Sequence, residues 1–185
     1  MALHALEVAH NNNEPKRQNV RSMDAAVITQ AKPEIITLVT AINQSPASDA
    51  LRCQFTPAQW ETLANYIHPF AVQASQVVIE QGAQDRSLYF IETGTLSVHY
   101  QDDKGRVRMA MVGAGSMVGE GAFFSHLPRC ATVQASGPTR LWCLTPLRFL
   151  ELANRHSALA LELTIGMGSV MAKRLYNRAK RVAVT

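Results

Sequence analysis

The sequence predicts an α+β protein in which an antiparallel, jelly-roll-like β-barrel is flanked by N-terminal helices and a long C-terminal helix. Residues 76–144 contain six short apolar segments separated by turns, which is typical of such a barrel. The segments before and after this region carry apolar residues at helical spacing instead. A chain of 185 residues has room for one domain with a substantial core and an appendage. We therefore expect an N-terminal arm over residues 1–54 and a barrel domain with its C-terminal helix over residues 55–185.

The N-terminal arm begins with a polar stretch and continues as a helix. Residues 1–22 include three consecutive asparagines and a Glu-Pro-Lys-Arg run, a composition that predicts disorder. Residues 23–44 are predicted to be helical, because their apolar side chains recur at steps of three and four: Ile35, Leu38, Val39 and Ile42. We expect this apolar face to cover the barrel rather than a partner. Residues 45–49 form a short linker.

A second helix is predicted from its N-terminal signals. The residues of a capping box and a hydrophobic staple occur in register: Phe55, Thr56, Gln59 and Trp60. Pro57 suits the first helical turn. The helix is expected to continue to about Ile67 and to stop before Pro69, because the residue before a proline disfavours helical geometry.

Six strands are predicted between residues 70 and 145. They cover residues 76–80, 87–91, 95–100, 106–112, 131–135 and 140–144. Apolar and polar residues alternate in two of them, with the apolar members Leu96, Val98, Tyr100, Val107, Met109 and Met111. The intervening turns contain Gly82, Gly94, Gly105 and the pair Gly113 and Gly115, as strand connections require.

The C-terminal region is predicted to form a short helix around residues 149–152 and a long one from Leu159. Apolar and small residues of the long helix follow a heptad pattern: Leu161, Ile165, Gly168, Ala172, Leu175, Ala179 and Val182. A second apolar face consists of Leu163, Met167 and Val170. We interpret the second face as packing on the barrel and the heptad face as the seam of a homodimer, although the heptad face could also pack on the barrel itself.

Residues 118–135 include residue types that suit the binding of a small anionic ligand with a sugar. Gly119 lets the backbone approach a ligand, because it has no Cβ. A short helix after it would direct free N–H groups at negative charge. Glu120 can only accept hydrogen bonds, which suits a ribose hydroxyl. Arg129 offers a planar fork of donors that matches phosphate oxygens, and its removal is expected to leave the fold intact.

This segment resembles the phosphate-binding cassette of cyclic nucleotide-binding domains, in which Gly-Glu, a small apolar helix and Arg-x-Ala precede a strand. The Gln81-Gly82 and Tyr89-Phe-Ile segments fit the same resemblance, which covers roughly residues 55–180. It implies that Glu120 holds the ribose 2′-hydroxyl and that Arg129 holds the cyclic phosphate. The remaining candidate ligand contacts are Gly119, Gly121, Ala122, Cys130, Ala131 and Thr132. The family's long helix caps the purine, which makes Tyr176, Asn177 and Arg178 candidates, and Arg178 joins the predicted site.

Two cassette positions depart from the family pattern. Gly121 stands where an aliphatic residue is usual, and glycine costs roughly 1 kcal/mol against alanine in a helix. Cys130 stands where alanine, serine or threonine is usual, so a hydroxyl is missing beside the phosphate. Because no threonine follows Arg129, we expect cAMP rather than cGMP as the better ligand.

Composition excludes several other classes. The net charge of +4 is too small to indicate nucleic-acid binding by itself. Three separated cysteines and six scattered histidines predict neither a disulfide framework nor a metal site. No window approaches the roughly 18 apolar residues of a membrane span, and the start lacks the pattern of a signal peptide. We therefore expect a cytoplasmic protein with no membrane segment, no metal and no cofactor other than the nucleotide ligand.

The resemblance implies a receptor, and three hypotheses follow. The first is a stand-alone receptor for cAMP or cGMP that signals to an unidentified effector protein. The second is an interaction module with a degenerate pocket, or a receptor for a cyclic dinucleotide such as cyclic di-GMP. The third, an enzyme of the barrel class, has no support, because no nucleophile is paired with a base and no catalytic residue is evident. The family's transcription factors carry a helix-turn-helix domain after the long helix, and since the sequence ends at Thr185 we expect no specific DNA binding.

Overall fold

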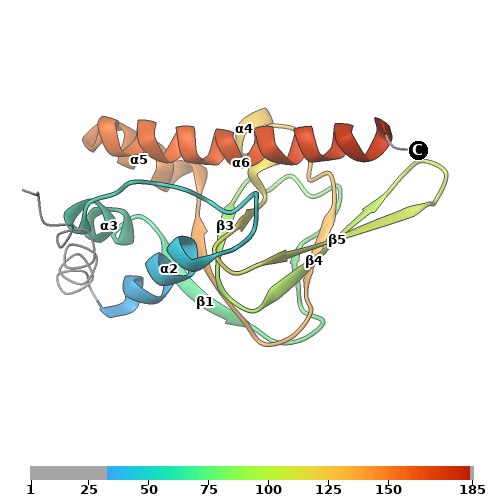
Figure 1. Ribbon diagram of the computed structural model, residues 1–185, viewed down its shortest axis with the longest axis horizontal. Coiled ribbons are helices and arrows are strands. Elements are labelled where there is room, and N and C mark those ends of the chain that lie inside the picture. The colour runs from blue at the N-terminus through green and yellow to red at the C-terminus, as the bar shows by residue number, and fades with distance from the viewer. Residues whose placement is uncertain (1–32, 184–185) are drawn as a thin grey trace, which may run out of the picture.

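The computed structural model describes residues 33–183, and the side chains of residues 35–177. Figure 1 shows two sheets facing each other, with the long helix α6 (Ser157–Ala183) lying across one side of the strands. The predicted disorder of residues 1–22 and the first part of the predicted helix over residues 23–44 lie outside the described residues. The described part of that helix is α2 (Pro33–Gln44), which ends where the sequence predicts.

Each sheet has four strands, and every strand pair is antiparallel. The first sheet has the order β1 (His68–Val72), β8 (Thr139–Leu144), β3 (Leu88–Thr93) and β6 (Met117–Val118). The second has the order β2 (Val77–Ile79), β7 (Thr132–Ala135), β4 (Thr95–Gln101) and β5 (Val107–Gly113). The sheets do not close into a barrel, but the arrangement is the jelly roll that the sequence predicts.

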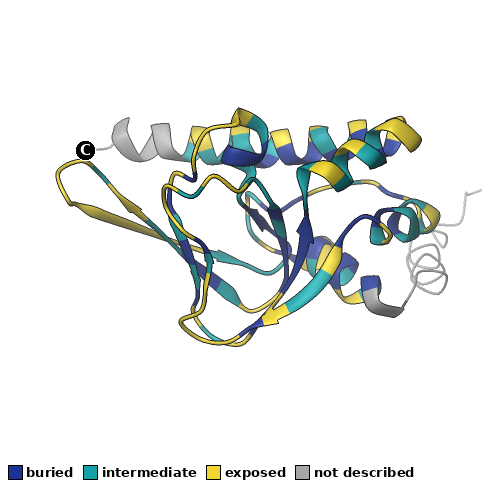
Figure 2. Cartoon of the chain, turned by 180° about the vertical axis from the view of Figure 1, so that it is seen from behind, coloured by how far each residue is buried: buried dark blue, intermediate teal, exposed yellow. Residues whose placement is uncertain are grey.

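Strands β3, β6 and β8 of the first sheet are largely buried on both faces, as the dark blue strands of Figure 2 indicate, whereas the edge strand β1 is mostly exposed or half-buried. The inner face of the first sheet and that of the second enclose one apolar cluster: Val72, Ile79, Ile91, Leu96, Val118, Val133, Ala135 and Leu141. Its outer face, which includes Phe90 and Trp142, packs against the helices in a second and larger cluster. The helices therefore form a third layer that covers only one of the two sheets.

Helix α2 belongs to this third layer. Ile35, Leu38, Val39 and Ile42 are all buried, in the same cluster as Trp142. The prediction that this apolar face covers the chain's own strands is confirmed.

Helix α3 (Pro57–Ala64) begins as predicted. The Thr56 side chain accepts a hydrogen bond from the Gln59 amide, and the Gln59 side chain accepts one from the Thr56 amide. Phe55 and Trp60 pack edge to face with ring centroids 4.8 Å apart, which completes the staple. The helix ends three residues earlier than Ile67, because the chain turns into β1 at His68.

Strand β1 was not predicted from the sequence. Pro69 lies within it, and a proline normally argues against a strand because it has no N–H to donate. Here β1 is at the edge of its sheet and pairs only with β8 among the described strands, so the missing donor costs little. The two-residue strand β6 is too short to have a recognisable sequence pattern.

The last two helices pack side by side. Helix α5 (Pro146–Arg155) is capped by Thr145, whose hydroxyl accepts from the Arg148 amide. In α6 the predicted inner face is fully buried: Leu163, Met167 and Val170. The heptad face is exposed in the single chain, with Leu161, Ile165 and Leu175 each more than 60% exposed.

Candidate functional site

A cavity of about 900 Å³ opens between the second sheet, the segment after β6 and helix α6. Its strand wall is mostly apolar and includes Ile79, Val98, Tyr100, Val112 and Val133. Its charged lining residues are Asp49, Arg108, Glu120, Arg129 and Arg174. A cavity of a few hundred to a thousand cubic ångströms with one apolar wall and a few charged groups is typical of a small-molecule site.

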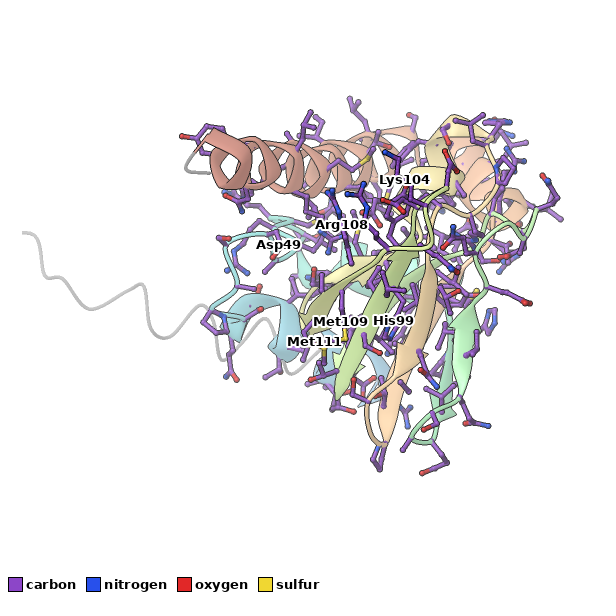
Figure 3. All side chains as sticks on the ribbon, turned by 90° about the vertical axis from the view of Figure 1, so that its right-hand side faces the viewer. Asp49, His99, Lys104, Arg108, Met109 and Met111 are labelled. Carbon is purple, nitrogen blue, oxygen red and sulfur yellow. The ribbon has the colours of Figure 1, made fainter. Side chains whose placement is uncertain are left out.

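Strand β5 directs the more apolar of its two rows outward. Its residues Val112, Ala110 and Arg108 stand opposite Leu96, Val98 and Tyr100 of β4, and Leu96 is completely buried. The inner row of β5 is therefore the one that contains Arg108. The alternating row Val107, Met109 and Met111 lies on the outer face and is more than half exposed. In Figure 3, Arg108 lies near α6, whereas Met109 and Met111 lie lower on the sheet, away from that helix.

Gly119 initiates the short helix α4 (Glu120–Ser125) in a left-handed conformation with φ of 91°. A Cβ at this position would lie 2.7 Å from Nη1 of Arg129 and 2.7 Å from the carbonyl oxygen of Ser87. Only glycine can therefore satisfy both the backbone angle and the close approach. By contrast, a Cβ on Gly121 would meet no atom within 4 Å.

Arg129 is almost completely buried, with 3% of its surface exposed. Its guanidinium donates to Asp85 through Nε and Nη2, to the Ser87 carbonyl through Nη2 at 2.6 Å, and to the Gly119 carbonyl through Nη1 at 3.1 Å. Four of the five N–H donors of the guanidinium are thus bonded within the described residues. One Nη1 hydrogen remains for a ligand. The pair of donors that the sequence predicts to bind two phosphate oxygens is bonded to Asp85 instead.

The electrostatics of this pair fix the charge state of Asp85. The hydrogen bond from Arg129 lowers the pKa of the Asp85 carboxyl more than its partial burial raises it. Asp85 is therefore an anion at neutral pH and neutralises Arg129. A phosphate bound at this point would meet a buried, oriented guanidinium whose charge is shared with a carboxylate.

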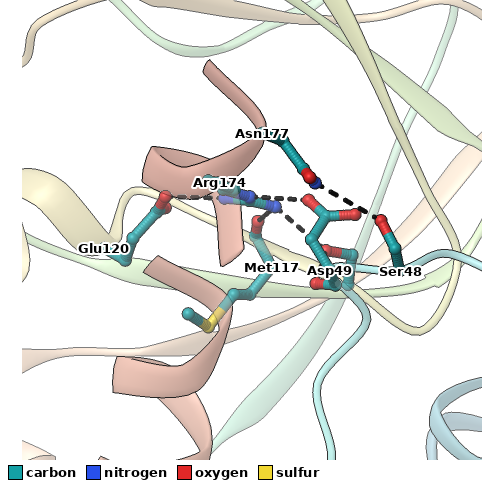
Figure 4. A network of polar contacts seen from close by, with 7 residues as sticks. Ser48, Asp49, Met117, Glu120, Arg174 and Asn177 are labelled. Atoms are coloured by element: carbon teal, nitrogen blue, oxygen red, sulfur yellow. Dashed lines mark hydrogen bonds and ion pairs between the residues drawn. The ribbon is translucent and has the colours of Figure 1, made fainter. Parts of the chain in front are cut away.

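Glu120 is held by a residue that the sequence did not single out. Arg174 on α6 donates from Nη1 to Oε1 of Glu120 at 2.6 Å and from Nε to Oδ2 of Asp49 at 2.8 Å (Figure 4). Its Nη2 group donates to the Ser116 hydroxyl and to the Met117 carbonyl. Burial by itself would lower the pKa of Arg174, but the charges and hydrogen bonds of Glu120 and Asp49 outweigh it and raise the pKa.

The predicted site residues mostly converge on this cavity. Seven of them line it: Gly119, Glu120, Gly121, Ala122, Arg129, Cys130 and Ala131. Thr132 does not, since it lies in β7 and its hydroxyl accepts from the Gln81 amide. Of the residues proposed to reach a base, Asn177 lines the cavity and the Arg178 side chain lies outside the described residues.

Three charged lining residues were not predicted from the sequence: Asp49, Arg108 and Arg174. A signal for Arg174 existed, because it continues the buried stripe Leu163, Met167 and Val170 at the same steps of four and three, followed by Asn177. A charged residue on an otherwise apolar, buried helix face indicates that this part of the helix contacts polar groups. Asp49 gave no such signal, since a linker aspartate is normally solvated.

The described part of the chain holds no group of three or more His, Cys, Asp or Glu side chains close enough to bind an ion. None of its helices combines the length and the apolar character that a bilayer-spanning segment requires.

An apolar cavity with an oriented arginine and a carboxylate, set in a jelly roll under a long helix, has the chemistry that suits a small anionic ligand. Residues 69–156 match the family described as the cyclic nucleotide-binding domain. This part of the chain is therefore a cyclic nucleotide-binding domain, as the cassette resemblance predicts.

A relative and two solved structures are similar to this chain in sequence or in fold. The cAMP-dependent protein kinase regulatory subunit of Blastocladiella emersonii is 33% identical over 101 residues, which are 54% of this chain and 25% of that protein. A cyclic nucleotide-binding domain from Methylobacillus flagellatus KT superposes with a TM-score of 0.72 at 20% identity and covers 81% of this chain and 83% of its own. The regulatory domain of Toxoplasma gondii PKA with cAMP gives a TM-score of 0.53 at 25% identity, covering 68% and 46% of the two chains. This chain thus spans only a quarter of the length of the first relative.

Proposed function

We propose that this protein is a cyclic nucleotide receptor that binds cAMP or cGMP in the described cavity and passes its occupancy to an effector protein. The observation that carries the proposal is the convergence of Glu120 and Arg129 on one cavity with an apolar wall. The cyclic nucleotide is the ligand, and the proposal includes no cofactor and no metal. The relative from Blastocladiella, named as a cAMP-dependent regulatory subunit, supports the choice of ligand class.

The charged end of the cavity suits the sugar phosphate. The remaining Nη1 hydrogen of Arg129 and the first amides of α4 would hold the cyclic phosphate, since helix N-termini present unpaired N–H groups. Glu120 would accept from the ribose 2′-hydroxyl. The strand wall beside Val98 and Tyr100 would cover the purine, with Asn177 reaching it from α6.

Signalling would be a shift between two arrangements of the long helix. Arg174 and Asn177 place α6 against the cavity, so a ligand in the cavity has contacts that depend on the position of this helix. A ligand changes the populations only as far as it binds one arrangement more tightly. The position of the exposed heptad face would change together with α6. We assign this face to the interface of a homodimer.

The proposal assigns neither catalysis nor sequence-specific DNA binding to this domain, and it places the protein in the cytoplasm. The matched segment corresponds to regulatory domains, which supports a sensory role. The N-terminal arm over residues 1–54 is the proposed effector contact, and residues 55–185 the sensory domain.

A second candidate is a cyclic dinucleotide receptor. The cavity volume of about 900 Å³ favours it, because a ligand larger than one mononucleotide could be accommodated. Its second phosphate would need a cation besides Arg129, and Arg108 lines the cavity from β5.

Calorimetric titration with cAMP, cGMP and cyclic di-GMP distinguishes these functions, with linear AMP as the control for non-specific phosphate binding. The proposal expects saturable binding of a cyclic mononucleotide and a raised melting temperature, since any ligand of the folded state stabilises it. Tight binding of cyclic di-GMP alone would favour the second candidate. If no cyclic nucleotide binds at millimolar concentration, the receptor function is wrong.

A further inference from the structure

We propose that His99, Met109 and Met111 form a binding site for a soft monovalent metal ion, Cu(I), on the outer face of the second sheet. His99 would bind the ion through Nδ1, and the two methionines would bind it through their thioether sulfurs. The site uses none of the residues assigned above to the nucleotide, so this inference goes beyond the proposed function and does not rest on it.

The three residues share one face of a strand pair. His99 of β4 stands directly opposite Met109 of β5, and Met111 follows Met109 in the same row. Both backbone groups of Gln101 bond the Gln81 side chain, so the odd-numbered residues of β4 turn their backbone groups away from β5. His99 and Met109 are therefore a non-hydrogen-bonded pair, the kind whose side chains lie closest. Met111 is the diagonal neighbour of His99, at a separation that long side chains can span.

The two methionines are placed where packing does not explain them. Met109 and Met111 are 65% and 55% exposed, whereas Met117 and Met167 are completely buried and fill the core as methionines ordinarily do. In Figure 3, Met109 and Met111 lie beside His99 on the sheet, away from α6. Their side chains are thus open to an ion from solvent.

Hydrogen bonds fix the imidazole of His99 in a tautomer that can bind a metal. The Ser97 hydroxyl has one hydrogen, which it donates to the Gln134 carbonyl oxygen at 3.2 Å. Its contact with Nε2 of His99 at 2.9 Å must therefore be a hydrogen bond that the imidazole donates. The lone pair of the neutral ring is then on Nδ1, which has no hydrogen bond to any residue in the described part of the chain. Such a bond from the ring nitrogen away from the ion is the usual support of a metal-binding histidine.

The donor set selects the class of ion. One imidazole nitrogen and two thioether sulfurs are soft, neutral ligands, which favour Cu(I) over the hard ions that prefer oxygen. Neutral ligands leave the charge of the ion uncompensated, and this costs less for a monovalent ion than for a divalent one. The sequence prediction of no metal site considered cysteines and histidines, and so it did not include thioethers.

The surroundings of the three residues fit the same class. The other residues on this face of β4, β5 and β7 are all uncharged: Thr95, Ser97, Gln101, Val107, Gly113, Thr132 and Gln134. No carboxylate in these three strands therefore competes as a ligand for a harder ion, and no cation in them repels Cu(I).

Competition with the Cu(I) chelator bicinchoninate, without oxygen and with a reductant present, measures the affinity for the ion. The parent protein for every measurement is Cys130→Ser, because the exposed thiol of Cys130 would itself bind Cu(I). This parent should take up Cu(I) from the chelator. Ser97→Ala keeps all three ligands and removes only the hydrogen bond to the imidazole, so it should weaken binding roughly tenfold.

The variants that remove a ligand should lose more affinity than Ser97→Ala does. They are His99→Gln, Met109→Leu and Met111→Leu, and the two leucine substitutions keep an apolar side chain of similar size at an exposed position, so the fold is retained. Met171→Leu is the matched control, since it makes the same substitution at a half-buried methionine of α6, and it should bind as the parent does. If Met109→Leu and Met111→Leu bind Cu(I) as tightly as Met171→Leu, the ion is held elsewhere and the proposed site is wrong.

Nuclear magnetic resonance of methyl-labelled methionine gives a second readout on the folded protein. Titration of the parent with Ag(I), a soft monovalent ion that is not oxidised under these conditions, should shift the methyl signals of Met109 and Met111 and leave that of Met171 in place. Unmoved signals of Met109 and Met111 would overturn the proposal. No nucleotide is present in either experiment, so neither result bears on the proposed receptor function.

Discussion

Arg129 and Asp85 are 44 residues apart in the sequence and are joined by two hydrogen bonds, from Nε to Oδ2 at 3.1 Å and from Nη2 to Oδ1. The same guanidinium bonds the carbonyls of Ser87 and Gly119. From the sequence, Arg129 was expected to bind phosphate and to be dispensable for the fold. The structure argues against the second expectation, because this side chain connects the cassette to the segment before β3.

Arg129→Ala should therefore have two effects. Loss of the phosphate contact should weaken nucleotide binding on the order of a hundredfold. Loss of the internal hydrogen bonds should lower the free energy of unfolding by about 1–3 kcal/mol. Calorimetric titration measures the first effect and urea denaturation the second. Arg106→Ala, which removes an exposed arginine of the β4–β5 turn, is the control and should change neither. A variant with wild-type stability would show that the internal bonds contribute nothing.

Asp85→Asn should separate the two roles of Arg129. It removes a negative charge near the bound phosphate and releases donors of the guanidinium, so affinity for the nucleotide should rise severalfold. Stability should fall, because the buried guanidinium of Arg129 loses its ionic partner. Opposite changes in affinity and stability are the expected signature. A fall in both quantities would indicate that Asp85 orients Arg129 for the ligand.

The same pair predicts how stability depends on pH. Because Arg129 holds the pKa of folded Asp85 below its ordinary value of 3.8, the contribution of Asp85 is complete above that value. It is lost as the pH falls through the lowered pKa, where the folded carboxylate takes up its proton. The difference in unfolding free energy between the wild type and Asp85→Asn should thus be constant near neutral pH and shrink below about pH 4. A difference that stays constant into strong acid would contradict this.

Gly121→Ala should stabilise the protein. A Cβ at Gly121 meets no atom within 4 Å, and Gly121 is not among the residues with positive φ. Replacing a helical glycine by alanine gains about 0.4–1 kcal/mol, mainly by restricting the unfolded chain. Thermal or urea unfolding measures the gain. Gly119→Ala is the matched comparison and should destabilise, since its φ of 91° and the close approach of Arg129 both exclude a side chain.

Thiol labelling should report ligand binding at Cys130. Of the three cysteines, Cys130 is exposed and lines the cavity, Cys143 is buried and Cys53 is half-buried. Burial raises the pKa of Cys53 to about 12 and also raises that of Cys143, so neither forms a thiolate readily at neutral pH. A chromogenic disulfide should react with one thiol per native chain, and saturating cyclic nucleotide should slow that reaction severalfold. Cys130→Ser should abolish the rapid reaction; equal rates with and without nucleotide would place the ligand elsewhere.

The cassette was predictable because its chemistry lies in one short segment. Gly119, Glu120 and Arg129 are close in sequence, and their residue types indicate phosphate and sugar contacts without knowledge of the rest of the fold. The residues that form ion pairs and hydrogen bonds with Glu120 and Arg129 were not predictable in this way. Asp85, Asp49 and Arg174 come from distant segments. Only the folded arrangement shows that Asp85 pairs with Arg129 and that Arg174, which is also bonded to Asp49, pairs with Glu120.

Strands β4 and β5 show the same limit of prediction from sequence on a local scale. Alternation located β4 and β5 correctly, but it could not say which row of β5 faces inward. An apolar row is expected inside, whereas here Val107, Met109 and Met111 are more than half exposed and Arg108 belongs to the inner row. A cavity lined by residues of both rows of β5, not a packed core, lies beside this edge strand. The hydrophobic pattern predicts burial only where the opposite face is filled with protein.

The exposed face of α6 leads to the last prediction, a homodimer. Leu161, Ile165 and Leu175 are more than 60% exposed, and they follow each other in heptad register with Gly168 and Ala172 between them. Small residues in the middle of the seam allow two helices to approach closely. A second copy of the same helix presents the same pattern, so the face is complementary to itself. We expect the wild type to sediment as a dimer at micromolar concentration.

Leu175→Glu should convert this dimer to monomers, because association would bury an unpaired carboxylate on each side of the seam. Leu147→Glu is the matched control: Leu147 is also a highly exposed leucine, with 74% of its surface accessible, but it lies on α5 outside the heptad face. Sedimentation velocity of both variants over a range of concentrations makes the comparison, and circular dichroism verifies that both are folded. A monomeric wild type at high concentration, or a Leu175→Glu variant as dimeric as Leu147→Glu, would mean that the heptad face of α6 contacts something other than a second copy.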